Sequence, residues 1–323
     1  MIGISQARAP AARATAKIRL SPRRVARFAW IVAAGALIIL AVATPGFLSR
    51  PSLIALVNSA SLVGCVAIGM TFITMSGNLM SFSLGATASA CAVTFMATLN
   101  YGLAPALLLT LAFGAALTAI QGFLVGWLRA NPIIVSMAAF ALILGFADHF
   151  IGAKIDAPND SYAFLKGRLA GVPIAFIIFV VAALVAQFIL SSTTFGHQLR
   201  LVGSNRRAGE AAAVDVPRIV TGAYAMAGLF TALSGVLLAV RYDSGDMQMG
   251  TGFEYQAIAA VLLGGVAIEG GRGSIGLAFA GVMAIVTMNT IALLWGLGID
   301  MQHLLVGVAV VIVVVLQGLE RWR

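Results

Sequence analysis

The distribution of charged residues constrains this chain more than any other feature. Eight long stretches contain no Asp, Glu, Lys or Arg, and together they cover more than two thirds of the 323 residues. A helix needs about 20 apolar residues to cross a bilayer, because lipid offers no hydrogen-bond partners to open backbone groups. At 61% hydrophobic and 10% charged residues, the chain also has too little polar surface for a water-soluble domain. We therefore predict an all-α polytopic membrane protein.

Turn-forming residues divide the longest charge-free stretch, 51–128, into three helices. The divisions fall at Ser76-Gly77-Asn78 and Asn100-Tyr101-Gly102. The segment 254–269 has a charge-free core of only 14 residues, so a re-entrant segment is the alternative there. About ten transmembrane helices are predicted, at 28–48, 53–75, 79–99, 104–127, 132–151, 173–191, 219–240, 254–269, 274–297 and 302–319.

The basic residues predict the orientation of these helices, because cytoplasmic flanks carry an excess of Lys and Arg. Ten spans with a cytoplasmic N-terminus place 15 basic residues inside and 5 outside, against 12 and 8 if 254–269 turns back. We therefore expect both termini in the cytoplasm. The expected order is a basic N-terminal segment (1–27), one transmembrane domain (28–319) and a short cytoplasmic tail (320–323). The longest hydrophilic loops are expected outside at 152–172 and inside at 192–218.

The net charge of +9 does not indicate nucleic-acid binding, because seven basic residues and no acidic ones are gathered in the segment before the first span. Residues typical of catalysis are also missing. The sequence contains no G-x-x-x-x-G-K-[ST] loop for nucleotide phosphates, no H-E-x-x-H and no G-x-S-x-G. The three histidines are far apart, and Cys65 and Cys91 lie in apolar stretches, so no metal site is predicted.

No charged residue falls in the middle of a predicted span, and the nearest, Asp148 and Glu254, lie by span ends. A proton-coupled carrier would need such a residue, and a membrane-embedded enzyme would need a nucleophile, base or metal. A transport protein that takes its energy from another chain is therefore favoured over both.

The loop 192–218 is the longest polar insertion in the chain. Asn205 is expected to cap a short helix over about 206–214, with Pro217 ending it. A short helix across the membrane surface is suited to passing force from a cytoplasmic partner. An ordinary basic connector fits the composition of this loop equally well.

This loop resembles the coupling loop of inner-membrane permeases of bacterial ABC importers. The resemblance is to the class that carries ribose and other simple sugars and is related to branched-chain amino-acid permeases. Gly209 and Ala213 depart from it, since they replace an Ala and a Gly. The matching residues are Thr193 or Thr194, Phe195, Gly196, Gly203, Asn205, Ala208 and Val214.

Three further motifs extend the resemblance over about residues 53–318. Residues 67–72 with Ser76-Gly77 are similar to the end of the second span of the class, and 122–125 with 132–137 are similar to a later motif. The stretch FEYQAIAAVLLGG…GGRGS (253–274) closely resembles a third. The segment 78–85, NLMSFSLG, departs from the G-I-D-L-S-V-G of the class: it is one residue longer and lacks the Asp. That segment lies near the transport path in the class, so the departure bears on specificity.

The resemblance implies a non-catalytic transmembrane permease subunit of an ABC importer in the bacterial inner membrane. It would translocate a small polar solute, a monosaccharide or polyol, by alternating access. Besides membrane lipid, the implied partners are a periplasmic solute-binding protein and a cytoplasmic ABC ATPase that binds ATP and Mg²⁺, so no cofactor is expected in this chain. A homodimer, or a heterodimer with a similar permease, would form the pathway. The alternative is an ion-coupled secondary transporter, and no residue distinguishes pentose, hexose, polyol, nucleoside or amino acid.

Three sets of candidate functional residues follow, and no metal-binding set. The polar path residues also fit interhelical hydrogen bonds, and the docking residues also fit solvated side chains at a helix end. Gly122-x-x-x-Gly126 is interpreted as a helix-packing face. The predicted ATPase-coupling residues are Phe195, Gly196, Gly203, Asn205, Arg206, Arg207, Ala208 and Glu210. The predicted translocation-path residues are Asn58, Thr74, Asn78, Ser81, Ser83, Gln121 and Asn289. The predicted docking residues for the binding protein are Arg241, Asp243 and Asp246.

Overall fold

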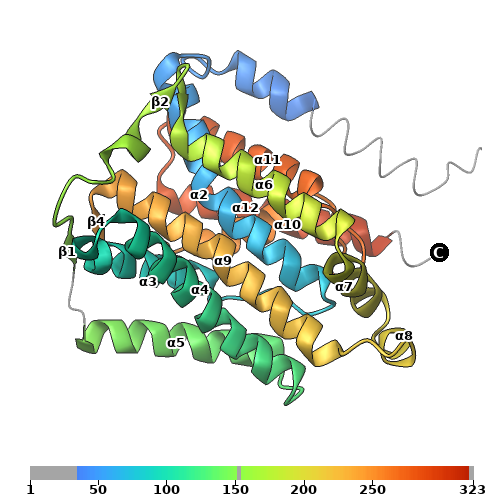
Figure 1. Ribbon diagram of the computed structural model, residues 1–323. Helices are drawn as coiled ribbons and strands as arrows, with labels where there is room; N and C mark the ends of the chain where they lie inside the picture. The colour runs from blue at the N-terminus through green and yellow to red at the C-terminus, as the bar shows by residue number, and fades with distance from the viewer. Residues whose placement is uncertain (1–34, 151–153, 320–323) are drawn as a thin grey trace, which may run out of the picture.

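The computed structural model describes residues 35–150 and 154–319, in which long helices run side by side (Figure 1). Residues 35–43 form a helix that precedes the helix beginning at Arg50. The helices are α2 (Arg50–Met75), α3 (Leu84–Thr98), α4 (Leu103–Gly126), α5 (Pro132–Phe150), α6 (Ile174–Ser192), α7 (Thr194–Ser204), α8 (Arg206–Ala211), α9 (Val216–Tyr242), α10 (Phe253–Leu263), α11 (Ile275–Leu294) and α12 (Ile299–Leu319). Two short 3₁₀ helices are η1 (Leu99–Tyr101) and η2 (Ala163–Lys166).

Four two-residue strands lie at the end of the bundle opposite α8 (Figure 1). Strand β1 (Ile155–Asp156) pairs antiparallel with β4 (Ser244–Gly245), and β2 (Arg168–Leu169) pairs antiparallel with β3 (Val172–Pro173). The two ends of the bundle are called here the α8 end and the β4 end.

Five of the described helices, α2, α4, α6, α9 and α11, are long and apolar enough to cross a membrane. Shorter apolar segments occupy α5 (Pro132–Phe146), α10 and α12 (Asp300–Val315). The chain is therefore an all-α, multi-pass membrane protein. The count of ten spans and the cytoplasmic position of both ends remain predictions. The segments 1–27 and 320–323 and the first part of span 28–48 lie outside the described residues.

Three predicted spans differ from the helices in the structure. The helix within the predicted span 28–48 ends at Ala43. The prediction of a helix over 79–99 was wrong at its start, because α3 begins only at Leu84 and residues 79–83 form an irregular segment. The prediction of a helix over 254–269 was also wrong, because α10 ends at Leu263 and the glycine-rich residues that follow are irregular. Eleven residues make a helix about 16 Å long, which is about half the hydrocarbon core of a bilayer.

Helix α9 is buried along most of its length and packs mainly against α4, α2 and α3. Its contact with α4 is close because small residues face each other. A Cβ atom at Gly228 would overlap the carbonyl oxygen of Gly114, and one at Gly122 would lie 2.9 Å from the Cα of Thr221. Close backbone approach through small residues is typical of membrane helix pairs. The geometry therefore agrees with the interpretation of Gly122-x-x-x-Gly126 as a packing face.

Candidate coupling and translocation sites

The polar loop 192–218 contains two helices rather than the single helix expected over 206–214. Thr193 caps α7 by accepting a hydrogen bond from the Gly196 N–H at 3.2 Å, and Asn205 caps α8 by accepting one from the Ala208 N–H at 3.2 Å. The predicted cap at Asn205 is confirmed, but α8 ends at Ala211. Pro217 lies in the first turn of α9, so it begins a helix instead of ending one. Helix α7 was missed although its buried side chains Leu199 and Val202 lie three residues apart, a helical spacing that is visible in the sequence.

The predicted coupling residues divide into packed and exposed positions. Phe195 lies against Gly222 of α9, Gly196 lies against the last turn of α6, and Gly203 is buried. Arg207 and Glu210 of α8 are exposed. The packed positions hold α7 against the bundle, while α8 presents charged side chains outward.

Helix α8 forms one wall of a cavity of about 640 Å³ at its end of the bundle. Arg206 and Arg207 line this cavity together with Arg129 and Asn78, which lie in the α4–α5 connection and after α2. The Arg206 Nε lies 3.3 Å from Glu210 Oε1, a surface pair within one helical turn. The predicted path residue Asn78 therefore lies with the predicted coupling residues, in a strongly basic opening.

Four glycines, Gly77, Gly203, Gly270 and Gly271, bring three chain segments together beside α7; this set is called the glycine junction. A Cβ atom at Gly203 would overlap the carbonyl oxygen of Met75, the last residue of α2, and one at Gly270 would overlap the backbone of Gly77. The Gly271 N–H donates to the Met75 carbonyl at 3.1 Å. The end of α7 is therefore in backbone contact both with the end of α2 and with the irregular segment after α10.

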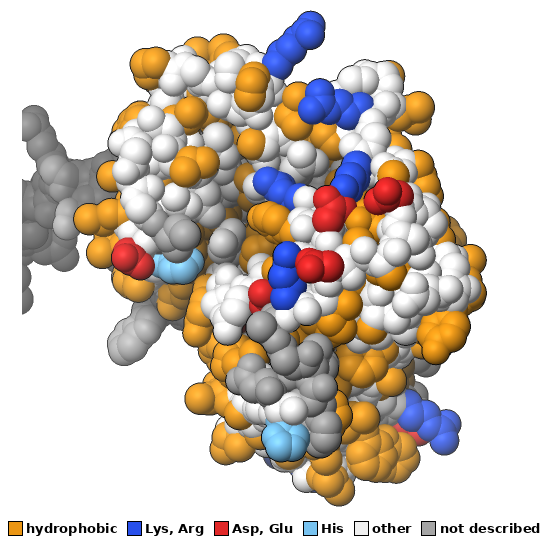
Figure 2. All heavy atoms as spheres, turned by 90° about the vertical axis from the view of Figure 1, so that its left-hand side faces the viewer, with side chains coloured by type: hydrophobic (Ala, Val, Ile, Leu, Met, Phe, Trp, Pro, Cys, Tyr) orange, Lys and Arg blue, Asp and Glu red, His pale blue; other side chains and the backbone are white. Residues whose placement is uncertain are grey.

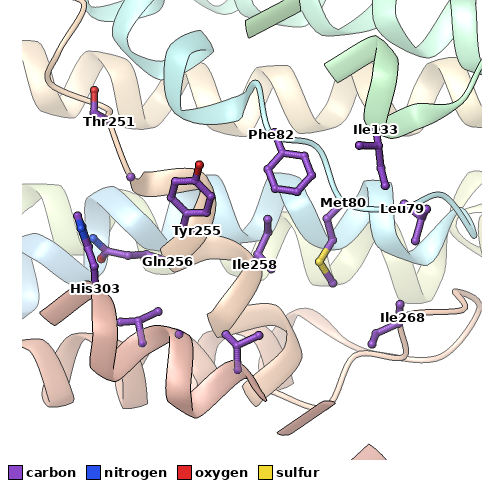
Figure 3. Close-up of a pocket in the computed structure, with 14 residues that line it drawn as sticks. Leu79, Met80, Phe82, Ile133, Thr251, Tyr255, Gln256, Ile258, Ile268 and His303 are labelled. Atoms are coloured by element: carbon purple, nitrogen blue, oxygen red, sulfur yellow. The ribbon is translucent and has the colours of Figure 1, made fainter. Parts of the chain in front are cut away.

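A second cavity, of about 530 Å³, lies between α10, α12 and the irregular segment 79–83 (Figure 3). Both irregular segments that leave the glycine junction contribute to its wall: Leu79, Met80 and Phe82 from one, and Ile268 from the other. The remaining lining residues are Ile133, Thr251, Gly252, Tyr255, Gln256, Ile258, His303, Val306, Gly307 and Val310.

The predicted translocation-path residues do not form one site. Ser83 donates to the Gln121 side-chain carbonyl at 2.8 Å, and the Ser81 and Ser83 hydroxyls are 3.1 Å apart, all buried. Thr74 is buried and donates to the Met70 carbonyl in its own helix. These contacts agree with the alternative interpretation of such residues, in which their side chains form hydrogen bonds within and between helices instead of lining a path.

Asn289 lies closer to the second cavity. Its side-chain N–H donates to Gln256 Oε1 at 3.3 Å, and Gln256 lines the cavity wall. The lining residues Tyr255 and His303 were missed by sequence reasoning. They lie near the ends of predicted spans, where aromatic and polar side chains are common. Their positions in the sequence therefore did not distinguish them from ordinary residues at a membrane surface.

Glu254 precedes these lining residues and is 3% exposed. Its Oε1 accepts a hydrogen bond from the Gly252 N–H at 3.3 Å, whereas its Oε2 has no hydrogen-bond partner among the described residues. Glu254 is not one of the cavity-lining residues. It is a buried carboxyl group next to the cavity wall, in a position that the sequence placed at a span end.

Charged side chains gather in the middle of the β4 end, with hydrophobic side chains at its rim (Figure 2). Asp243 accepts hydrogen bonds from the Lys166 ammonium and the Tyr162 hydroxyl, which join the end of α9 to the loop 154–173. The bond from Lys166 and then that from Tyr162 lower the pKa of the Asp243 carboxyl. Burial and the bond to Asp243 raise the pKa of the Tyr162 phenol.

The three predicted docking residues therefore differ in what they contact. Asp243 holds the outer loop, and Asp246 accepts a hydrogen bond from the Gln248 N–H at 2.8 Å within its own turn. Arg241 is exposed and lies over the ring of Tyr242 at 5.7 Å. It also lines a cavity of about 210 Å³ together with Arg168 and the predicted path residue Asn58.

Comparisons with known proteins agree over most of the chain. A family model described as the permease component of a branched-chain amino acid transport system matches residues 52–315. The ribose import permease protein RbsC of Bacillus subtilis is 30% identical over 285 residues, which cover 86% of this chain and 88% of the relative. The probable ABC transporter permease protein YphD of Escherichia coli K12 is 30% identical over 276 residues, 84% of this chain and 82% of the relative. The autoinducer 2 import system permease protein LsrD of the same strain is 29% identical over 264 residues, 77% of this chain and 80% of the relative. No solved structure shows significant similarity to the chain.

Proposed function

The chain belongs to the family of permease components of branched-chain amino acid transport systems, and from this membership we propose that it is the membrane-spanning subunit of an ABC importer for a monosaccharide or related polyol. It is an ABC transporter permease, a transport component rather than an enzyme. The relatives named for ribose and autoinducer 2 import support a sugar-like solute. The bacterial inner membrane is the location that this class of importer implies.

The observation that supports coupling to an ATPase is the continuous contact from α8 to the second cavity. Helix α8 is joined to α7 by Asn205 alone, and α7 ends in the glycine junction. From there one segment leads to Leu79 and Met80 and the other to Ile268, all in the cavity wall. A displacement of α8 would therefore act on two sides of the same cavity. Alternating access requires such a connection between the ATPase and the path.

In this proposal the α8 end faces the cytoplasm. Arg129, Arg206 and Arg207 lie there, as the positive-inside rule requires. An ABC ATPase that binds ATP and Mg²⁺ would dock on α8, and a periplasmic solute-binding protein would dock on the charged β4 end near Arg241. A second permease subunit, the same or similar, would complete the pathway.

The coupling proposal is tested by the double substitution Arg206→Glu with Arg207→Glu. Reversing two charges at the α8 surface should weaken co-purification of the ATPase, while membrane insertion of the permease is unchanged. The matched control is Arg50→Glu, because Arg50 is exposed at the start of α2, at the other end of that helix from Met75 and outside the loop 192–218. Unchanged ATPase binding and unchanged ATP-driven uptake in the double variant would refute the role of α8.

The second candidate function is an ion-coupled secondary transporter, and buried Glu254 is the observation that favours it. A carboxyl group in the membrane can carry a proton or bind Na⁺. The two candidates differ in their energy source. Solute accumulation by the purified chain alone in vesicles, driven by a proton or Na⁺ gradient, would establish the carrier and exclude the importer.

A further inference from the structure

Three arginines line the basic cavity at the α8 end of the bundle. Arg206 and Arg207 belong to α8, and Arg129 belongs to the connection between α4 and α5. The cavity therefore lies between two segments that are far apart in the sequence but reach the same end of the bundle (Figure 1). Its volume of about 640 Å³ is typical of a small-molecule site.

The charges of this cavity are not balanced by its own residues. Glu210 is the single acidic residue among the described lining residues, and it pairs with Arg206 at 3.3 Å. In the part of the chain that the structure describes, neither Arg129 nor Arg207 forms an ion pair. The described lining thus has an excess of two positive charges. Like charges held close together repel each other, so an anion between them would stabilise this arrangement.

The backbone at Arg129 is also unusual. It is left-handed, with φ of 54°, a conformation that is uncommon except for Gly, Asn and Asp. The Ala130 N–H donates to the Leu124 carbonyl at 3.2 Å, so the chain turns back over the end of α4 at this residue. A basic residue at the carbonyl end of a helix is favourable by itself, but that effect explains one arginine and not three from two segments. Strained backbone at a residue that lines a cavity is typical of ligand sites.

Exposed apolar side chains lie next to Arg129 in the chain. Trp127 and Leu128, which precede it, are 49% and 65% exposed, and Ile134 in the first turn of α5 is 67% exposed. Trp127 stacks on Phe123 with ring centroids 6.0 Å apart. Tryptophan at the end of a membrane helix typically lies at the level of the lipid headgroups. The cavity therefore lies where the membrane-facing apolar surface meets the polar end of the bundle.

This combination distinguishes between the possible anions. A soluble phosphate, or an acidic patch of another protein, would use the arginines alone. An anionic phospholipid would use both features, because guanidinium groups bind phosphate oxygens well and acyl chains pack on exposed apolar side chains. Basic cavities between membrane helices on the cytoplasmic side recognise lipid headgroups in this way. The neighbouring apolar surface therefore favours a lipid.

We propose that the cavity lined by Arg129, Arg206 and Arg207 is a specific binding site for one anionic phospholipid of the surrounding membrane. This inference goes beyond the importer function, because the ATPase would dock on the outer surface of α8, whereas the lipid would lie between α8 and the α4–α5 connection. A phosphate bound by Arg129 and Arg207 would join the two segments. The lipid would therefore restrain the position of α8 relative to α4.

The test titrates the full chain, purified in a non-ionic detergent, with lipid and counts the bound molecules by native mass spectrometry. Phosphatidylglycerol, which is anionic, is compared with zwitterionic phosphatidylcholine that has the same acyl chains. The variants are Arg129→Gln, Arg129→Gln with Arg207→Gln, and Arg129→Lys, which keeps the charge. The matched control is Arg272→Gln, because Arg272 is exposed, directly follows the glycine junction and does not line the cavity.

We expect the unmodified chain to bind one phosphatidylglycerol more tightly than any phosphatidylcholine. Arg129→Gln should weaken that binding about fivefold and the double variant about thirtyfold, because each arginine near an anionic headgroup contributes a similar free energy. Arg129→Lys and Arg272→Gln should bind phosphatidylglycerol almost as the unmodified chain does. Unchanged phosphatidylcholine binding and size-exclusion profiles show that the variants are folded.

Four outcomes would overturn the inference. If the unmodified chain binds both lipids equally tightly, or if the double variant binds phosphatidylglycerol as tightly as the unmodified chain, the arginines do not select a lipid. If inorganic phosphate at the same concentration displaces phosphatidylglycerol, the site takes a soluble anion and the apolar surface contributes nothing. If the purified ATPase displaces it, the cavity belongs to the ATPase interface. None of these results contradicts the importer proposal, which is tested separately by ATP-driven uptake.

Discussion

At the scale of single residues, Asp243 is the residue that joins two distant parts of the chain. It accepts hydrogen bonds from Tyr162 and Lys166, about eighty positions earlier in the sequence. Its position directly after α9 is also unusual, because its backbone is left-handed with φ of 56°. Asn, like Asp, tolerates that conformation, so Asp243→Asn removes the charge with little change in backbone preference.

We expect Asp243→Asn to loosen the loop 154–173 without unfolding the bundle. The contact is a partly exposed ion pair and hydrogen bond, so its contribution is at most about 1 kcal/mol. Because the pKa of Asp243 is lowered in the folded protein, its contribution is present above the usual carboxyl range and is lost as the pH falls through the lowered pKa. Limited proteolysis of the loop as a function of pH measures this, with Asp246→Asn as the control. Equal cleavage of Asp243→Asn and the unmodified chain at neutral pH would contradict the prediction.

Residue-scale features were predictable only where they depend on near neighbours. The cap at Asn205 depends on a backbone N–H three residues later, so the local sequence was sufficient. The bonds from Tyr162 and Lys166 to Asp243, and that from Ser83 to Gln121, join residues far apart in sequence. A single sequence contains the polar groups but not their pairing.

At the scale of helices, hydropathy located most elements because crossing lipid demands an apolar segment of fixed length. It failed at 79–83, where Leu79, Met80 and Phe82 line the second cavity without being helical. Hydropathy does not distinguish an apolar side chain that faces lipid from one that lines a cavity. The same limit applies after Leu263, where Val266 is fully buried in an irregular segment.

The contact between α4 and α9 predicts that substitutions at two glycines differ strongly in their effect on stability. Gly228→Leu should destabilise the protein by about 1–3 kcal/mol, because side-chain atoms would be forced into the Gly114 backbone. Gly145→Ala in α5 is the control, since no atom lies within 4 Å of its added Cβ. Thermal unfolding of both variants in detergent is the measurement. Similar midpoints for Gly228→Leu and the unmodified chain would show that the helices can separate here without loss of stability.

A substitution in the glycine junction should impair the coupling of ATP hydrolysis to transport rather than the assembly of the permease with the ATPase. Gly203→Ala places a Cβ against the Met75 carbonyl, so the contact of α7 with the end of α2 must change. Coupling changes of this kind are typically about 0.5–2 kcal/mol, which corresponds to a loss of about 2- to 30-fold in ATP-driven uptake. ATPase co-purification should be unchanged.

Gly209→Ala is the matched control for Gly203→Ala. Its added Cβ would meet the end of the Val202 side chain at 3.1 Å, and the resembling class of permeases has Ala at this position. Its uptake rate should stay close to that of the unmodified chain. If the two variants transport equally well, the glycine junction does not transmit movement.

At the scale of the whole molecule, sequence reasoning reached the family and the membrane fold but not the relation between sites. It placed the coupling loop and the transport path in separate segments, with nothing to connect them. In the structure Gly203, a predicted coupling residue, contacts the segments that line the second cavity. That connection arises from glycines in three segments of the chain. The sequence around each glycine, taken alone, indicates only a turn.

The source of energy is also a property of the whole molecule, and a substitution at Glu254 can test it. The sequence argument against an ion-coupled carrier was that no charge lies in mid-span. Glu254 is nevertheless 3% exposed, with Oε2 unpartnered among the described residues. It contacts the backbone at Gly252 and lies behind the cavity wall, so in the importer its role is to hold the turn before α10.

Glu254→Gln separates these roles because glutamine keeps the shape and the acceptor oxygen but cannot release or bind a proton. In the importer, ATP-driven uptake should persist in the assembled complex with a loss of at most about 13-fold, since one neutral hydrogen bond is worth about 0.5–1.5 kcal/mol. Glu254→Ala should reduce it further, because the Gly252 N–H loses its partner. In an ion-coupled carrier, Glu254→Gln would instead abolish gradient-driven uptake. Uptake by reconstituted complexes, measured with ATP and separately with an imposed proton gradient, distinguishes a structural carboxyl group from an ion-binding one.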